Sequence, residues 1–166
     1  MQSREPQSDR ILEQTTLPDS LSPAAVATLV AVTPEARRAL GDRDRVQVTH
    51  FPFKFGRASS SVDPEHDTND AHLIESGDST LRHISRQHFT IECVDGETFL
   101  VDRGSATGTI VAGTRVGGNR KPGRIALRHG ETIVVGTHRS QYIFRFEIWT
   151  DSTATDTDIF LQLNLY

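Results

Sequence analysis

The sequence predicts an all-β domain, an antiparallel sandwich or barrel, on three grounds. Apolar and polar residues alternate over many short stretches, turn residues separate these stretches at close spacing, and no long segment has the helical period. The chain has 166 residues, which suits one domain with tails better than two domains. Its formal net charge of -4 lacks the basic excess that nucleic-acid binding usually requires, so no DNA or RNA partner is expected.

A strand and then one or two helical turns are expected at the start of the domain. Residues 28–32 form a short apolar stretch that predicts the strand. Thr33 suits the N-cap of the following helix, Pro34 suits its first position, and Gly41 suits its end.

The segments after this helix read as strands, because their apolar residues recur with a period of two. The apolar positions are even at Val46 and Val48 but odd from Phe51 onward, so a bulge or bend is expected at residues 50–52. Asp95-Gly96 predicts a two-residue hairpin between strands at residues 89–93 and 98–102. Further strands are expected at residues 110–111, 125–127, 133–135 and 141–149.

The core is expected to contain the apolar side chains that alternate along these strands. Cys93 continues the apolar positions of Phe89 and Ile91, which predicts a small core residue. Six aromatic residues are expected in the core for the same reason, and not as a platform for stacking bases: Phe51, Phe53, Phe55, Tyr142, Phe144 and Phe146.

Both ends of the chain have the composition of tails. Residues 1–25 contain few apolar positions, so a disordered N-terminal tail is expected before a domain at residues 26–149. Residues 150–166 begin as a linker rich in Thr and Asp and end in an apolar stretch, which could add an edge strand or pack on the domain. Neither a secretory start nor the roughly 20 apolar residues of a membrane span is evident, so we expect a cytoplasmic protein without membrane contact.

Charge is segregated between two parts of the chain. Residues 58–84 carry six acids and one Arg, whereas residues 103–128 carry six basic residues and no acid. His66 and His72 lie among the acids, but their spacing matches no metal-ligand template, so neither a metal nor a cofactor is expected. The role of the acidic segment stays open.

Three short motifs occur in a fixed order within the domain. They are Gly56-Arg57, then Ser85 to His88 with two residues between, and then Ser105-Ala106-Thr107-Gly108-Thr109. This ordered set resembles the forkhead-associated (FHA) domain family over about residues 27–149. The resemblance implies an antiparallel β-sandwich of about eleven strands with a short helix after the first strand, and it implies binding of phosphothreonine peptides.

The resemblance also implies which residues bind the peptide. Arg57 would contact the phosphothreonine or its backbone, because its guanidinium stays charged and presents a planar fork of donors. Ser85 would donate its hydroxyl to a phosphate oxygen, and Arg86 would offer its backbone amide and its charge. Backbone donors at Ala106 and Thr107 would complete the contacts, with the Thr107 hydroxyl as a further donor.

Other motif residues would support the shape of the site. By resemblance, His88 joins loops by hydrogen bonds and transfers no proton, and Gly56, Gly108 and Thr109 hold the loops around it. The sequence departs from the family where Ala106-Thr107 replaces a Thr-Asn pair, and Ala112 replaces a second Asn. Each missing hydrogen bond to a charged group would weaken binding by about 1.5 to 3 kcal/mol, roughly 10- to 150-fold. Arg103 or Arg115 could compensate for the loss.

Three functional hypotheses follow. The first is a non-catalytic phosphothreonine-recognition module that acts as an adaptor in a Ser/Thr kinase pathway, with the kinase as a partner. The second is an FHA-like scaffold that docks a partner protein without phosphate, as the Ala106-Thr107 departure suggests. The least favoured is a hydrolase that uses Ser85 and His88, since no orienting acid or oxyanion loop is identifiable.

The tails contain candidate phosphorylation sites that could occupy the pocket of the same molecule. Thr16, Thr153 and Thr155 are each followed three positions later by an Asp, and FHA domains often read that position with an acidic preference. Abundant Thr and Asp in plain linkers would give the same pattern.

Overall fold

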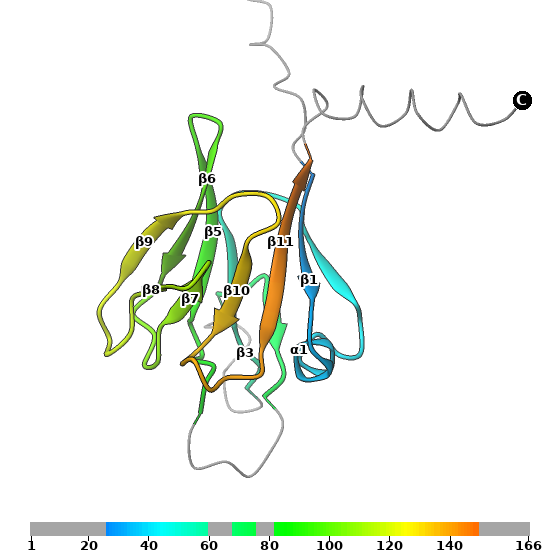
Figure 1. Ribbon diagram of the computed structural model, residues 1–166, viewed down its shortest axis with the longest axis vertical. Coiled ribbons are helices and arrows are strands. Elements are labelled where there is room, and N and C mark those ends of the chain that lie inside the picture. Colours follow the sequence, from blue (N-terminus) through cyan, green and yellow to red (C-terminus); the bar gives the residue numbers. More distant parts are fainter. Residues whose placement is uncertain (1–25, 60–67, 76–81, 150–166) are drawn as a thin grey trace, which may run out of the picture.

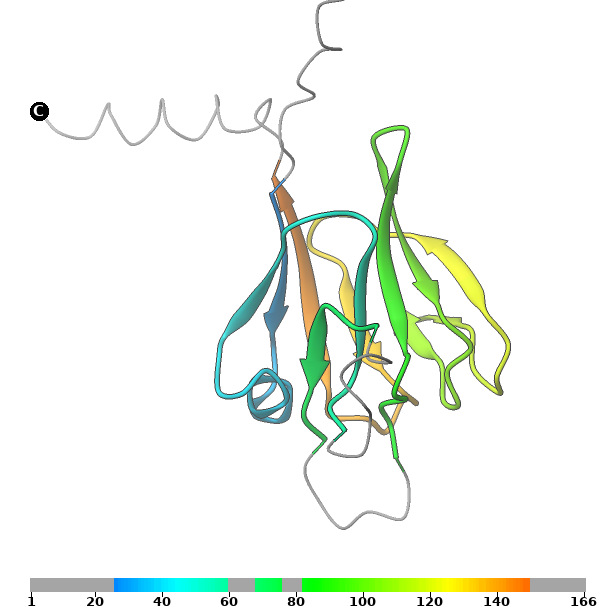
Figure 2. The ribbon, with the colours of Figure 1, turned by 180° about the vertical axis from the view of Figure 1, so that it is seen from behind.

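The computed structural model describes residues 26–59, 68–75 and 82–149, which form two β-sheets packed face to face (Figures 1 and 2). One sheet has six strands in the order β2-β1-β11-β10-β7-β8, and the other has five in the order β4-β3-β5-β6-β9. The elements are β1 Val26–Ala31, α1 Pro34–Ala39, β2 Arg45–Val48, β3 Phe53–Arg57, β4 Ala71–Leu73, β5 Phe89–Val94, β6 Glu97–Asp102, β7 Thr109–Val111, β8 Thr114–Val116, β9 Gly123–Ala126, β10 Thr132–Val135 and β11 Ile143–Trp149. The predicted eleven-stranded sandwich with a short helix after the first strand is therefore confirmed.

Helix α1 begins and ends where the sequence predicts. The Thr33 side chain accepts a hydrogen bond from the Ala36 amide at 3.2 Å, and Pro34 is the first helical residue. Gly41 follows with a φ of 66°, a left-handed conformation that glycine adopts without steric cost. In the part of the chain that the structure describes, no helix is long and apolar enough to cross a membrane.

The slip in apolar phase marks the passage of the chain from one sheet to the other. β2 lies at the edge of the six-stranded sheet, and β3 belongs to the five-stranded sheet. The bend predicted at residues 50–52 is thus confirmed as the crossover between the sheets. β4 was not predicted, because its three residues are too few to show alternation; it pairs parallel to β3.

The two sheets enclose the predicted aromatic core. Phe53, Phe55, Tyr142, Phe144 and Phe146 are buried. Phe51 is partly buried and packs against the same cluster, and Phe55 and Phe89 stack with ring centroids 4.6 Å apart.

The expectation that Cys93 is a core residue is wrong. Cys93 is exposed. It lies near the tip of the β5–β6 hairpin, which has the predicted two-residue turn and extends beyond the rest of the sandwich (Figure 1). The alternation of β5 continues into this hairpin, where no facing strand covers it among the described residues.

Candidate functional site

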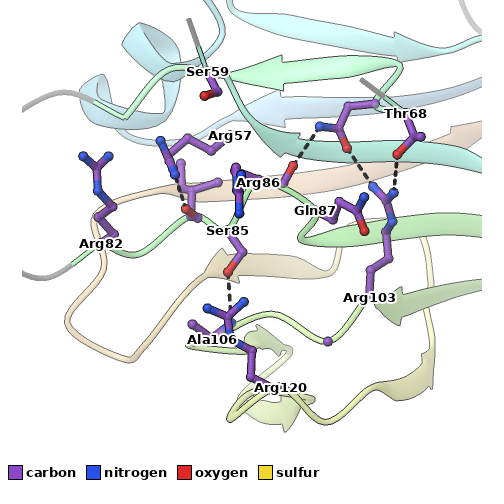
Figure 3. A pocket seen from close by; sticks show the side chains of 13 residues that line it. Arg57, Ser59, Thr68, Arg82, Ser85, Arg86, Gln87, Arg103, Ala106 and Arg120 are labelled. Atoms are coloured by element: carbon purple, nitrogen blue, oxygen red, sulfur yellow. Dashed lines mark hydrogen bonds between the residues drawn. The ribbon is translucent and has the colours of Figure 1, made fainter. Parts of the chain in front are cut away.

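A pocket of about 690 Å³ lies where segments entering or leaving five strands meet (Figure 3). These strands are all in the five-stranded sheet: β3, β4, β5, β6 and β9. Five of the described lining residues are arginines and none is acidic, so the pocket suits an anionic ligand. The lining consists of Arg57, Ser59, Thr68, Asn69, Arg82, Ile84, Ser85, Arg86, Gln87, Arg103, Gly104, Ala106 and Arg120.

Ser85 lies between two loops and keeps one donor for a ligand. Its Oγ accepts a hydrogen bond from the Ala106 amide at 2.9 Å, so the hydroxyl proton is not used in that bond. Its own amide donates to Nδ1 of His88 at 2.9 Å. Ser85 can therefore donate its hydroxyl proton into the pocket while its backbone stays fixed.

His88 joins the Ser85 turn to the loop after β6. Its ring is fully buried, and because Nδ1 accepts the Ser85 amide, Nε2 carries the proton and donates to the Gly108 carbonyl oxygen at 2.9 Å. Burial lowers the pKa of His88, although the Gly108 carbonyl and the carboxylates of Asp102 and Glu75 act in the opposite direction. The ring is therefore a neutral brace between two loops of the pocket.

Arg57 is fixed at the end of β3 by its backbone and by its side chain. Its amide donates to the Ser85 carbonyl at 2.9 Å, and its Nε donates to the Ile84 carbonyl at 3.1 Å. The side chain is 20% exposed, and its two terminal nitrogens make no hydrogen bond to a described residue. These terminal nitrogens can therefore donate to a ligand.

Glu75 is a buried acid behind Arg57 that the sequence did not single out. Its Oε2 lies 3.8 Å from Nε of Arg57 and has no hydrogen-bond partner among the described residues. Its Oε1 accepts from the His83 amide at 2.6 Å. Glu75 thus connects the segment before β5 to Arg57 and partly offsets the charge of the guanidinium.

Gly56 permits a close approach between two walls of the pocket. A Cβ at this position would lie 1.9 Å from the Arg86 carbonyl oxygen, so any side chain would push the Arg86 segment away. The Asn69 side chain donates to the same oxygen at 2.8 Å and accepts from Nη1 of Arg103 at 2.7 Å. Arg103 also donates to Thr68 at 2.9 Å, and this network holds its guanidinium in the lining.

The loop after β6 is shaped by Asp102 and Ser105, both fully buried. One Asp102 carboxylate oxygen accepts the amides of Gly104 and Ser105, and the other accepts the Ser105 hydroxyl at 2.7 Å. The Ser105 hydroxyl oxygen in turn accepts the Gly108 amide at 2.8 Å, where the φ of Gly108 is 79°. This buried carboxylate is satisfied by local donors and needs no cation.

The sequence-predicted binding residues are not all at the pocket. Arg57, Ser85, Arg86 and Ala106 line it, but Thr107 does not, since its hydroxyl donates to the His83 carbonyl at 2.7 Å. The Ala106 amide is also engaged within the protein, by Ser85. The supporting residues Gly108 and Thr109 are buried and do not line the pocket.

Of the two arginines considered as compensation, one lines the pocket. Arg103 is there, whereas Arg115 donates to the Thr107 carbonyl at 3.2 Å and is not part of the lining. Arg82 and Arg120 also line the pocket, although no motif includes them. The only sequence signal for Arg120 is the excess of basic residues between 103 and 128.

Comparison with known protein families identifies the family of the chain. The family model of the FHA domain matches residues 53–136, just over half of the 166 residues. The chain therefore belongs to the FHA domain family. No curated protein sequence matches the chain as a relative.

Solved structures share the fold at low sequence identity. The N-terminal FHA domain of S. cerevisiae Rad53p, solved in complex with a phosphothreonine peptide, is 20% identical with a TM-score of 0.50, covering 79% of this chain and 98% of that one. The yeast Pml1 splicing factor is 18% identical with a TM-score of 0.53, covering 79% and 85%. Mycobacterium tuberculosis EmbR, in complex with a low affinity phosphopeptide, is 22% identical with a TM-score of 0.49; the match covers 75% of this chain and only 25% of that one.

Proposed function

We propose that residues 26–149 form a non-catalytic module that binds phosphothreonine-containing peptides in the arginine-lined pocket. The observation that carries this proposal is the convergence of five arginines and the Ser85 hydroxyl on one pocket without an acidic residue in its described lining. A phosphate dianion is held best by several charged donors, above all by guanidinium groups. The phosphothreonine peptide bound to the FHA domain of Rad53p supports the same ligand class.

The geometry supports a separate role for each of these residues in binding the phosphate. The terminal nitrogens of Arg57 and the hydroxyl of Ser85 would donate to the phosphate, and Arg86 would contribute its charge from an exposed position. His88 and Gly108 would keep the two loops at a fixed separation, because one hydrogen bond joins them directly. Gly56 would let the Arg86 segment lie close to β3.

Phosphate-independent docking remains a second candidate, and one observation favours it. The Ala106 amide and the Thr107 hydroxyl already have partners within the protein, so the loop after β6 offers fewer donors to a phosphate than the motif predicts. In this case the pocket would accept a carboxylate-bearing or polar segment of a partner protein.

The hydrolase hypothesis has no support in the geometry. The Ser85 hydroxyl oxygen accepts from Ala106, and His88 Nδ1 accepts the Ser85 amide, not the hydroxyl. His88 Nε2 is occupied by the Gly108 carbonyl, so neither ring nitrogen is placed to take a proton from Ser85.

We further propose that the module serves as a cytoplasmic adaptor in a Ser/Thr kinase pathway and that its own phosphorylated tail can fill the pocket. Thr16, Thr153 and Thr155 lie outside the described residues, so this part rests on the sequence alone. A tethered site acts at an effective concentration of about millimolar, which would fill even a weak pocket. The test is to phosphorylate the full chain, confirm the sites by mass spectrometry and follow the amide NMR signals of Arg57 and Ser85; unchanged signals would remove the tail proposal.

A peptide titration separates phosphate-dependent from phosphate-independent binding. A degenerate peptide library with one fixed phosphothreonine is compared with the same library carrying threonine, and the best sequence is titrated by calorimetry in both forms. The proposal predicts that removing the phosphate weakens binding at least tenfold. Equal affinities for the two forms would favour the docking scaffold.

A further inference from the structure

The described lining of the pocket holds more guanidinium groups than one phosphate needs. It contains five arginines, of which Arg57 has the Glu75 carboxylate behind it. A phosphate held by Arg57 and Ser85 leaves other arginines of the described lining to face a further anionic group. A second phosphate would bring about -1.5 to -2 at pH 7, more negative charge than one acidic side chain.

The pocket is also larger than one phosphate requires. Its volume of about 690 Å³ lies in the range that holds a drug-sized ligand. A sphere of 690 Å³ is about 11 Å across, and one extended residue advances the chain by about 3.3 to 3.6 Å, so about three peptide residues fit within it. Two phosphate groups on neighbouring residues can therefore enter together.

The arginines are spread around the pocket. Figure 3 shows Arg57 and Arg120 on opposite sides of Ser85, with Arg120 beside Ala106. Arg57 comes from β3, whereas Arg120 comes from the loop between β8 and β9. A phosphate held by Arg57 and Ser85 would leave Arg120 available to another anionic group.

The fold holds Arg120 at this place in spite of an unfavourable backbone. Asn119 has a φ of 53° and Arg120 a φ of 63°, a left-handed conformation that is uncommon for residues other than glycine. The Asn119 amide donates to the Ala106 carbonyl at 2.9 Å, and the Arg120 amide donates to the Ser105 carbonyl at 3.0 Å. These two bonds tie the β8–β9 loop to the loop that carries Ala106, and so keep Arg120 in the lining.

We infer that the pocket selects peptides that carry two phosphate groups within about three residues of each other, and that Arg120 is the specificity-determining residue for the second phosphate. This inference rests on the proposed recognition of phosphothreonine. The ligand class is a doubly phosphorylated peptide segment, with the first phosphate at Arg57 and Ser85.

The test compares four forms of one peptide by calorimetry at about 0.15 M salt, where surface charge effects are screened beyond about 8 Å. One form is unphosphorylated, one carries a single phosphothreonine, one carries a second phosphorylated residue scanned over the three positions on either side, and one carries Asp at that second position. We expect the best doubly phosphorylated form to bind at least tenfold more tightly than the singly phosphorylated form, with Asp giving less than a threefold gain. Equal affinities of the singly and doubly phosphorylated forms, or an equal gain from Asp, would overturn the inference.

Matched variants locate the second phosphate. Arg120→Asn removes the guanidinium but keeps a residue type that tolerates a left-handed φ, and Lys121→Asn removes a neighbouring exposed charge that does not line the pocket. The gain is the ratio of the affinities for the doubly and the singly phosphorylated peptide, measured within each variant. Arg120→Asn should reduce this gain to less than threefold, whereas Lys121→Asn should keep it. Identical behaviour of the two variants, with equal melting temperatures, would overturn the role of Arg120.

The failure of this inference can be told apart from failure of the proposed function. If the singly phosphorylated peptide binds more tightly than the unphosphorylated one but a second phosphate adds nothing, only the inference fails. If the wild-type domain does not distinguish the singly phosphorylated peptide from the unphosphorylated one, the proposed function fails as well.

Discussion

Replacing His88 by Ala is expected to reduce both the stability of the domain and its affinity for a phosphopeptide. The buried ring accepts the Ser85 amide and donates to the Gly108 carbonyl, so the substitution removes the link between two loops of the pocket. The Gly108 carbonyl keeps a second partner, the Gly136 amide at 2.9 Å. The Ser85 amide loses the only hydrogen bond that it makes to a described residue.

The expected cost follows from these contacts. An amide left without a partner costs about 1 to 3 kcal/mol, and the removal of a buried ring adds a cavity term of similar or larger size. We therefore expect the free energy of unfolding to fall by about 3 kcal/mol or more. This is a large part of the roughly 5 to 15 kcal/mol by which a typical domain is stable. For a domain of this size, the melting temperature should fall by roughly 10 to 15 °C.

The assay is thermal unfolding together with calorimetric titration of the phosphopeptide. His138→Ala is the matched control, because His138 is exposed and does not line the pocket. We expect His88→Ala to show the lower melting temperature and the weaker binding, with little change in the control. An unchanged melting temperature in His88→Ala would refute the bracing role, and an associated loss of a measurable turnover would instead support an enzyme.

Three further predictions concern pH, backbone approach and the exposed hairpin. Because burial lowers the pKa of His88 below its usual 6.5, the unfolded chain takes up a proton more readily than the folded domain. The free energy of unfolding should therefore be at its full value above pH 6.5 and decline below that pH by up to about 1.4 kcal/mol per pH unit. Urea unfolding between pH 5 and 8 checks this, and the decline should be steeper in the wild type than in His88→Phe. Gly56→Ala should displace the Arg86 segment and weaken phosphopeptide binding more than tenfold, which is a loss of more than about 1.4 kcal/mol. An unchanged affinity by calorimetry would contradict the close approach. Cys93→Ser should alter the free energy of unfolding by less than about 0.5 kcal/mol because the side chain is exposed, whereas a loss of several kcal/mol would mean that the thiol packs in a core.

Local sequence patterns were sufficient for most of the fold. Alternation and turn chemistry act between near neighbours, so they predicted the β5–β6 hairpin at Asp95-Gly96 and the helix that begins after Thr33. They could not predict β4, which is too short for alternation, or the exposure of Cys93. That exposure depends on how far the hairpin extends beyond the sheets, and the alternation of residues within one strand gives no information about that length.

The ordered motifs identified some residues of the pocket lining but not all of its arginines. Arg57, Ser85 and Ala106 meet at one pocket although almost fifty residues of sequence separate the first from the last. Arg82 and Arg120 reach the pocket only because separate loops converge there, and no local pattern marks them. Of the donors expected at residues 106 and 107, the Ala106 amide and the Thr107 hydroxyl already make hydrogen bonds within the protein.

The central claim is that the phosphate binds where Arg57 and Ser85 meet, and a paired substitution tests it most directly. Calorimetry with one phosphothreonine peptide would compare the wild-type domain with Arg57→Ala and with Arg128→Ala, an exposed arginine outside the pocket. The loss of hydrogen bonds to a charged group predicts that Arg57→Ala weakens binding by about 1.5 to 3 kcal/mol, roughly 10- to 150-fold, while Arg128→Ala stays within about twofold of the wild type. Equal affinities of the two folded variants for the phosphopeptide would contradict the account.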